Sequence, residues 1–517
     1  PLDRRTHPHA RLDELRNRNR CGQSSPSHLP SATVWDWPVT DPAHTASGDG
    51  RRLQMWRPTT AGPNASMLSI GVARARHRDL VRNDPWASAA IDRSVSNGVG
   101  TGVQAKCLYG DDAFKAADKR AWKHFCKYID ADGTLDFSGL QALAWREWRE
   151  AGEVFARLRS RRLSDGLPIP MQVQMIESEQ CPHDYNATAP NGNRIESGIE
   201  FNFIGRRVAY WMYGSHPGEW SSSRTIDAAT LRRIPAEQIV HLYKPKRGGQ
   251  HRGSPDGIAA ITRLWNLGKF DDAVLERQKI ANLFALFYTR TAGADDSSMV
   301  DDMQTATDTD TTPLAGLEPG TAQELPVGVE PKFSTPPDAG GNYAEFYRQH
   351  LMAAAACYGV PAELLTGDLR GISDRALRLI LNEFRRLIEM DQWVYFIPQF
   401  CQTIREAYFD AAILAGVLTV PDYATSREDV VETLWVPQGW PYSHPVQDVK
   451  ADKEAILAGL QSRTATILSN GDDPEQVDAE IAADNARAAA LGLVFDTDVR
   501  NSHPPTPADP ALLDQNQ

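Results

Sequence analysis

The sequence predicts an α+β fold. Apolar residues recur at helical spacing in residues 66–151, apolar and polar residues alternate between residues 153 and 243, and long helical stripes return after residue 256. Strands grouped between runs of helix are typical of this class. The chain has 517 residues, 41% of them hydrophobic and 24% charged, so it can bury a sizeable core.

The first half begins with residues 1–65, which are rich in Pro, Ser, His and Arg and are expected to form an N-terminal arm; a plain flexible terminus is the equal alternative. Two helices separated by Pro85 are predicted between residues 66 and 98, because the residue before a proline resists helical geometry. The Gly-rich stretch after them predicts a turn that enters a strand. Further helices are expected over 112–128 and 137–151, and strands over 154–158, 171–176, 199–203, 208–213 and 239–243.

The second half opens with a predicted long helix. No proline occurs between Pro255 and Pro313, and a helical apolar stripe continues for about 32 residues, or about 48 Å. The side chains expected to pack along it are Leu264, Ile280, Leu283, Phe284 and Phe287.

Residues 291–330 differ sharply from that helix, since they contain nine acidic residues and no Lys or Arg. We expect a mobile acidic loop, followed by a short hairpin with residues 323–325 and 331–333 around Val327 and Gly328. The acidic residues proposed as a site are Asp295, Asp296, Asp301 and Asp302.

A helix is predicted over 342–358 and ends at Gly359 and Pro361. A loop follows at 366–373, and a long helix kinked at Pro398 covers 374–415. The chain beyond Pro445 is expected to be helical and acidic, with a proline-rich tail from residue 502.

Charge and motifs exclude several classes of protein. Lys and Arg number 55 against 67 Asp and Glu, a formal charge of −12, which argues against a protein that coats nucleic acid. No apolar run is long enough to span a membrane, and the six cysteines form no CxxC pair. The sequence lacks a P-loop, an HExxH and a GxSxG motif, so we expect no catalytic residue, cofactor or resident metal.

Three local basic clusters lie around Arg74–Arg82, Lys244–Arg252 and Arg375–Arg386. Such clusters are usually solvated or salt-bridged faces. The functional alternative is contact with phosphate or with an acidic neighbouring subunit.

Several motifs share their order with one known family. They are Ala73-Arg74-Ala75-Arg76, Gly152-Glu153-Val154-Phe155, Ile234-Pro235-Ala236-Glu237, Leu317-Glu318-Pro319-Gly320-Thr321 and Tyr358-Gly359-Val360-Pro361-Ala362-Glu363-Leu364-Leu365-Thr366-Gly367-Asp368. In this order, from Ala73 to Gly492, the chain resembles the lambda-type portal proteins of tailed bacteriophages. It departs from the family pattern at Asp374, Arg375 and Leu377, beside the loop at 366–373.

The resemblance implies a portal fold assembled as a ring, normally a dodecamer, at one capsid vertex of the virion. The implied parts are an N-terminal arm at 1–65, a mixed α+β wing at 66–255, stem helix 1 at 256–290, a clip at 291–341, stem helix 2 at 342–365, a tunnel loop at 366–374, a wing-return helix and strand at 375–444, and a crown with its tail at 445–517. The tunnel-loop residues are Gly367, Asp368, Leu369, Arg370, Gly371, Ile372 and Ser373.

The implied function is a channel for genome packaging and ejection, with no bond chemistry of its own. The expected partners are copies of itself, double-stranded DNA, the terminase large subunit, head–tail connector proteins and the major capsid protein, with no membrane; synthesis is expected in the host cytoplasm. The negative charge suggests an acidic channel wall that repels phosphate. Two alternatives are a metal-dependent DNA-processing enzyme that uses the aspartates at 295–302, and a structural ring unrelated to phage.

Overall fold

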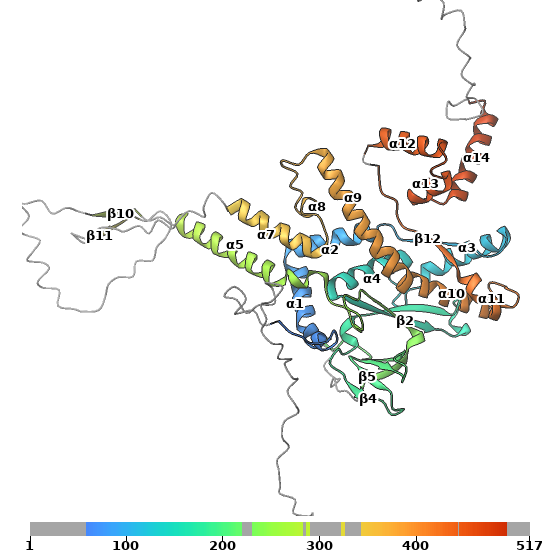
Figure 1. The fold of residues 1–517 in the computed structure, drawn as a ribbon, viewed down its shortest axis with the longest axis horizontal. Coiled ribbons are helices and arrows are strands. Elements are labelled where there is room, and N and C mark those ends of the chain that lie inside the picture. Colours follow the sequence, from blue (N-terminus) through green and yellow to red (C-terminus); the bar gives the residue numbers. More distant parts are fainter. Residues whose placement is uncertain are drawn as a thin grey trace, which may run out of the picture. The chain divides into compact units, whose positions relative to one another are not determined.

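A computed structural model describes residues 58–219, 230–282, 286–289, 322–325, 343–442 and 444–493 (Figure 1). Contacts divide the chain into a unit of residues 1–60 and a unit of residues 61–517. Only the second unit is described below. Helices and sheets both contribute to it, which confirms the predicted mixed class.

The N-terminal helices pack around tryptophans. Asp84 caps α2 by accepting hydrogen bonds from the backbone N–H groups of Trp86 and Ala87, and Pro85 occupies its first position. Trp145 and Trp148 on α4 are almost fully buried, and the Trp145 indole donates to Ser94 on α2 at 3.1 Å. The elements are η2 (Ala65–Ser69), α1 (Ile70–Asn83), α2 (Pro85–Gly98), α3 (Asp112–Tyr128) and α4 (Phe137–Ala151).

Two antiparallel sheets face each other across a small second core. The first has the order β3-β2-β9, and the second has the order β4-β5-β6-β7-β8. Alternate residues of β2 divide its faces: Val154 and Ala156 join the main core with α4, whereas Phe155 packs between the sheets. The elements are β2 (Glu153–Ser160), η3 (Leu163–Asp165), β3 (Met171–Ile176), η4 (Ser178–Gln180), β4 (Ala187–Thr188), β5 (Arg194–Glu196), β6 (Ile199–Phe201), β7 (Arg207–Met212), β8 (Arg232–Pro235), η6 (Ala236–Gln238) and β9 (Ile239–Tyr243).

Two glycines let the chain cross itself where the first sheet meets the next helices. A Cβ on Gly152, which has φ of +91°, would lie 2.2 Å from the Ser254 carbonyl carbon. A Cβ on Gly253 would lie 1.9 Å from the Gly152 carbonyl oxygen. Only glycine allows so close a backbone approach. The segment before η7 (Asp256–Ala259) is therefore held directly against the α4–β2 turn.

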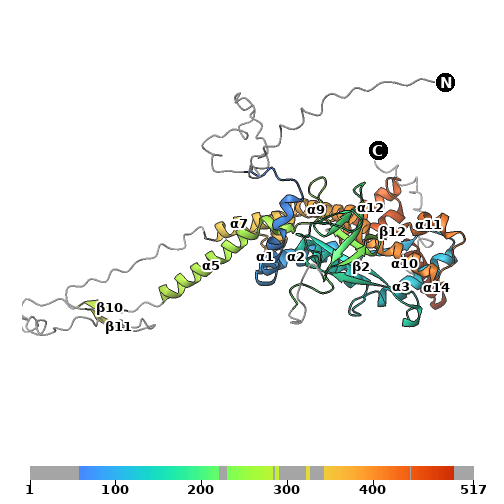
Figure 2. The same cartoon turned by 90° about the horizontal axis from the view of Figure 1, so that it is seen from below.

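The long helix α5 (Ile261–Asn282) runs beside α7 (Tyr343–Tyr358), as Figure 2 shows. The expectation of a helix through residue 290 is wrong, because Leu286–Thr289 form β10, paired in parallel with β11 (Ala322–Leu325). Leu-Phe-Tyr-Thr is rich in residues that favour strands, which explains the change. Of the expected hairpin, residues 323–325 lie in β11, and residues 331–333 lie outside the described residues.

The C-terminal half continues the main core and then leaves it. A π-helix, η8 (Gln392–Cys401), contains Pro398 and accommodates its missing N–H between α9 and α10, at the site of the predicted kink. An unpredicted pair joins β1 to β12, with Gln104 opposite Val436. The remaining elements are β1 (Gln104–Cys107), α8 (Ala362–Thr366), α9 (Asp374–Asp391), α10 (Gln402–Leu414), α11 (Tyr423–Val431), β12 (Thr433–Val436), α12 (Pro445–Leu457), α13 (Arg463–Ser469) and α14 (Pro474–Leu491).

No helix in the described ranges combines the length and apolar character needed to cross a bilayer.

Candidate functional site

The pair α5 and α7 packs through aromatic side chains and leaves other apolar side chains exposed. Phe270 on α5 stacks on Tyr343 of α7 with ring centroids 5.8 Å apart, and the Tyr343 hydroxyl donates to Asp271 at 2.7 Å. Phe270 is still 36% exposed, and four further apolar side chains of the pair are exposed: Trp265 54%, Leu275 58%, Phe346 44% and Met352 47%. An apolar surface of this kind is typical of a face that another polypeptide covers.

The predicted stem-packing residues have separate positions. Leu264 is 1% exposed and belongs to the main core. Ile280 lies in the last turn of α5, and Phe287 lies in β10, not in a helix. Leu283 and Phe284 lie outside the described residues, as do the acidic residues Asp295, Asp296, Asp301 and Asp302.

The predicted tunnel loop is an exposed, glycine-bounded turn between α8 and α9. Gly367 (φ +70°) ends α8 and Gly371 (φ +75°) allows the reversal, because both have positive φ. The Asp368 carboxylate accepts from Nε and Nη2 of Arg370 at 2.8 and 2.9 Å, and these hydrogen bonds hold the pKa of Asp368 well below its usual range.

The tip of the predicted tunnel loop lies in solvent, and the loop ends at the start of α9. Arg370 is 87% exposed, and Leu369 and Ile372 are joined by a backbone hydrogen bond of 3.3 Å. Ser373 caps α9 by accepting from the Ala376 N–H at 3.3 Å. The loop therefore presents a neutralised Asp368–Arg370 pair and has a fixed exit.

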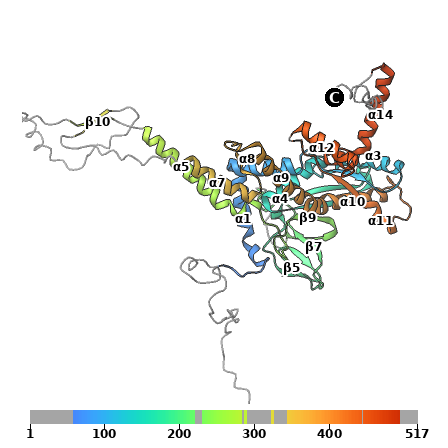
Figure 3. The ribbon, with the colours of Figure 1, turned by 45° about the horizontal axis from the view of Figure 1, so that its top comes forward.

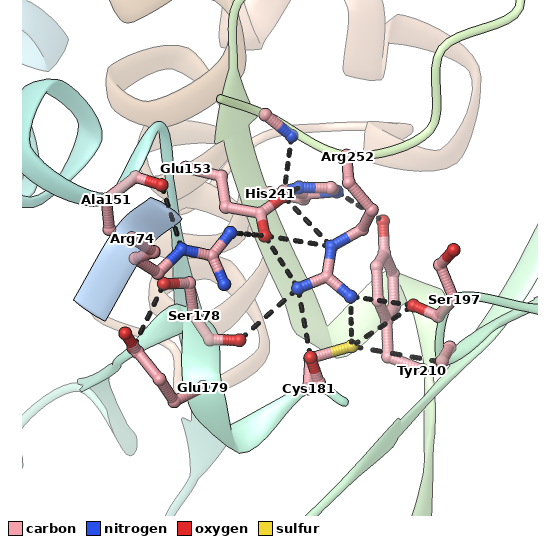
Figure 4. Close-up of polar contacts among 12 residues, drawn as sticks. Arg74, Ala151, Glu153, Ser178, Glu179, Cys181, Ser197, Tyr210, His241 and Arg252 are labelled. Atoms are coloured by element: carbon pink, nitrogen blue, oxygen red, sulfur yellow. Dashed lines mark hydrogen bonds and ion pairs between the residues drawn. The ribbon is translucent and has the colours of Figure 1, made fainter. Parts of the chain in front are cut away.

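A buried ionic cluster lies where α1, the first sheet and the crossing at Gly253 meet (Figure 4). The Glu153 carboxylate binds Arg74 at 2.8 Å and Arg252 at 2.6 Å, and it accepts from the Gly253 N–H at 2.9 Å. All three charged side chains are at most 1% exposed. Although burial opposes ionisation, Arg252 and the hydrogen bond from His241 keep the pKa of Glu153 well below its usual range.

His241 completes this cluster as a neutral donor. Its Nε2 lies 3.1 Å from Glu153, and burial lowers its pKa to about 4. Arg252 also donates from Nη1 to the main-chain oxygen of Ser197 at 2.7 Å and from Nη2 to the main-chain oxygen of Cys181 at 2.9 Å. Because these charged side chains are buried and paired with one another, the cluster holds α1, the first sheet and the segment around Gly253 together.

A second tie links α4 to α9 and η7. Arg149 lies between the Trp145 and Trp148 rings and binds Asp256 and Asp391, each at 2.6 Å. Lys244 on the segment after β9 binds the same Asp391 at 2.8 Å. The start of the long helix pair is therefore tied by charge to the core of the domain.

One group in the described part of the chain has metal-ligand composition: Glu177, Glu179 and His216, whose ligand atoms lie within 4.8 Å of one another. Arg78 already binds both Glu179 oxygens, at 2.9 and 3.0 Å. A cation would have to compete with this guanidinium, so the group fits an ion-pair network better than a metal centre.

The three predicted basic clusters are partly buried and ion-paired and partly exposed: Arg76, Arg82, Lys246, Arg247, Arg375 and Arg386 are exposed. Arg74 and Arg252 belong to the buried cluster, Arg78 binds Glu147 and Glu179, and Arg378 binds Asp374 at 3.0 Å. The sequence interpretation missed a different basic surface, the outer face of α3. Its signal was present in the lysines at positions 115, 119, 123 and 127, which recur every four residues.

Comparison with known proteins decides the family. The family model for "Phage portal protein, lambda family" matches residues 49–392, which is more than half of the chain. The chain belongs to the lambda family of phage portal proteins.

Relatives named as portal proteins cover most of this portal chain. The probable portal protein of Halomonas phage phiHAP-1 is 27% identical over 439 residues, 81% of each chain. Portal protein B of Escherichia phage lambda is 22% identical, over 86% of this chain and 90% of the relative. The portal protein of Escherichia phage N15 is 21% identical with the same coverage. The predicted family and its function as a portal protein of a phage or phage-like particle are confirmed.

Among solved structures, the neck of an empty GTA particle matches at a TM-score of 0.41 and 15% identity, over 81% of this chain and 96% of that one. The neck of a native GTA particle gives a TM-score of 0.41 and 14% identity over the same shares.

Proposed function

We propose that this portal protein forms a closed ring of about twelve copies around a channel for double-stranded DNA. The observation that carries the proposal is the set of exposed apolar side chains on α5 and α7, which are Trp265, Leu275, Phe346 and Met352. Monomeric proteins rarely expose much apolar surface, and neighbouring copies in a ring would cover these side chains.

The parts of the ring follow the order of the chain. Residues 66–255 and 375–444 form the wing, α5 and α7 form the stem, residues 291–341 form the clip, residues 366–374 form the tunnel loop, and α12–α14 form the crown. The ties at Glu153 and Arg149 support this division, because they attach the start of the stem to the wing.

The clip is proposed to dock the terminase large subunit during packaging and head–tail connector proteins afterwards, and the wing to contact the major capsid protein. The acidic sequence of the clip at residues 291–330 suits partners with basic surfaces. The ring acts in the virion as a conduit and catalyses no reaction, and the ATPase belongs to the terminase.

Native mass spectrometry of the purified protein tests the ring. We expect a closed assembly of about twelve copies; a stable monomer at micromolar concentration would contradict the proposal. The double variant Trp265→Ser, Leu275→Ser should keep its helical circular dichroism and lose the ring. The matched control Leu163→Ser, Phe203→Ser removes two apolar side chains that are 72% and 97% exposed outside the stem, and it should assemble normally.

A further inference from the structure

One side of α3 carries a row of cations from its second turn to its end, after an exposed Asp112 in the first turn. Lys115, Lys119, Lys123 and Lys127 follow one another at intervals of four residues, and Arg120 lies beside them. All but the half-buried Lys115 are exposed. The opposite half carries the buried side chains Asp118, Trp122 and Phe125. Since residues four apart share a helix face, the cations form a row about 18 Å long.

This row has few counter-charges of its own. Lys119 lies 3.6 Å from Asp473 on the segment before α14. Within the described ranges, no carboxylate lies within ion-pair distance of Lys115, Arg120, Lys123 or Lys127. Like charges four residues apart destabilise a helix, and the helix dipole favours cations only in the last turn. The row is therefore unfavourable for the isolated fold.

A second basic row begins where α3 ends. Gln172 donates to the Tyr128 carbonyl at 2.9 Å and accepts from Nε of Arg161 at 2.9 Å, so it joins the end of α3 to the end of β2. Arg157 and Arg159 lie on the face of β2 that carries Phe155, whereas α3 packs with Val154 and Ala156 on the other face, and Arg161 follows the end of the strand, so this row is separate from the row on α3. In the described part of the chain none of these three arginines has an ion-pair partner, and Arg159 donates to Gln174 at 3.0 Å.

We define the basic tract as the row on α3, namely Lys115, Lys119, Arg120, Lys123 and Lys127. Figure 3 shows α3 at the opposite end of the ribbon from α5 and α7. The tract is thus remote from the helix pair assigned to the channel.

The chemistry of the tract favours a polyanion over a folded protein. Protein interfaces depend on apolar and aromatic anchors at their centre. The exposed half of α3 offers cations, His124, the small residues Ala113 and Ala116, and one carboxylate, Asp112, in the first turn, but no large apolar side chain. A row of about 18 Å passes about five phosphates of one DNA strand, which rises 3.4 Å per nucleotide. Long side-chain donors that contact phosphate need no base sequence.

The chain's formal charge of −12 does not oppose this. At about 0.1 M salt, charges more than about 10 Å away are largely screened, so the nearby cations dominate the local potential. We propose that the basic tract binds the phosphate backbone of double-stranded DNA outside the channel, without reading its sequence. The choice of DNA as the polyanion rests on the proposed function.

The test compares two triple variants of the full chain. The tract variant is Arg120→Gln, Lys123→Gln, Lys127→Gln. The control is Lys450→Gln, Lys453→Gln, Arg463→Gln, which removes the same charge from exposed positions on α12 and α13. Fluorescence anisotropy of a labelled duplex is measured with each assembled protein between about 50 and 200 mM salt.

We expect the tract variant to bind at least about tenfold more weakly than wild type, and the slope of log K against log salt to fall by up to about 2.7 for three lost contacts. The control should bind like wild type. Equal affinities and slopes for the two variants would overturn the proposal. Tighter binding of poly-glutamate than of the duplex would overturn it also, in favour of an acidic protein partner.

Two further measurements keep failures apart. Circular dichroism and thermal melting check that both variants fold. Native mass spectrometry reports ring formation independently of DNA binding. If rings form and the two variants bind DNA equally, the proposal for the basic tract is refuted and the ring is not. If no rings form and only the tract variant loses DNA binding, the basic tract is supported and the ring is refuted.

Discussion

Replacing Glu153 with glutamine removes the one carboxylate shared by Arg74 and Arg252. Both guanidiniums are 1% exposed, and each lies within 2.8 Å of a Glu153 oxygen. Removing one partner of a buried ion pair leaves a buried charge without compensation, at a cost of about 3–5 kcal/mol. We therefore expect Glu153→Gln to lower the free energy of unfolding by about this amount, even though the side-chain shape is kept.

Urea unfolding followed by tryptophan fluorescence measures the effect. The matched control is Glu237→Gln, an exposed position that should change stability by less than about 0.5 kcal/mol. The double variant Glu153→Gln, Arg252→Gln should recover part of the loss, because it also removes one of the stranded charges. A Glu153→Gln protein within about 1 kcal/mol of wild type would refute the assignment of Glu153 as the shared counter-charge.

The direction in which stability changes with pH gives a second test of the role of Glu153. The pKa of Glu153 is depressed in the folded state, so its contribution is present above the ordinary glutamate pKa and is lost as pH falls through the folded value. The difference between wild type and Glu153→Gln should therefore persist from neutral pH into mild acid and shrink only in stronger acid.

Three further predictions address other regions. The pKa of His241 is lowered to about 4, so the free energy of unfolding should fall by up to about 3 kcal/mol as pH falls from about 6.5 to 4. The variant His241→Gln should lack this part of the pH profile in urea unfolding. Identical profiles for the variant and wild type would contradict a neutral buried histidine. Deleting residues 367–372 should spare ring assembly in native mass spectrometry and reduce the genome packaged or retained, measured as encapsidated DNA; unchanged packaging would remove this role from the loop. Asp473 caps α14 and binds Lys106 at 3.0 Å, so Asp473→Ala should destabilise α14 by about 1 kcal/mol and speed its cleavage in limited proteolysis, with Asp478→Ala as the control.

Periodicity was enough to predict the helices and several strands. The predicted ranges 112–128 and 137–151 agree with α3 and α4, and 171–176 and 239–243 agree with β3 and β9. In each case the apolar spacing lies within one continuous segment, and Asp111 and Asp136 cap the two helices. Long-range pairing has no such local signal, which is why the pairing of β1 with β12 was not predicted, although a strand was expected after the Gly-rich turn and another within residues 375–444.

The site was harder to predict for the same reason. Arg74 and Arg252 looked like surface cations in sequence, but their shared partner Glu153 is 79 and 99 residues away. The loop at Gly367–Ser373 was found because its glycines and the Ser373 cap are local features. The basic face of α3 had a local signal too, because its four lysines recur every four residues. The apolar half of the helix was interpreted and these lysines were not.

The crossing of Gly152 and Gly253 affects how the molecule transmits force. At this point main chain rests on main chain, so no side chain lies between them that could rotate and absorb movement. Side-chain rotation at this contact therefore cannot absorb a displacement along the long helix, so we expect the helix and the sheet to tilt together. A methyl group added at either glycine would clash with the opposing main chain. We therefore expect alanine at position 152 or 253 to separate the two segments and weaken this coupling.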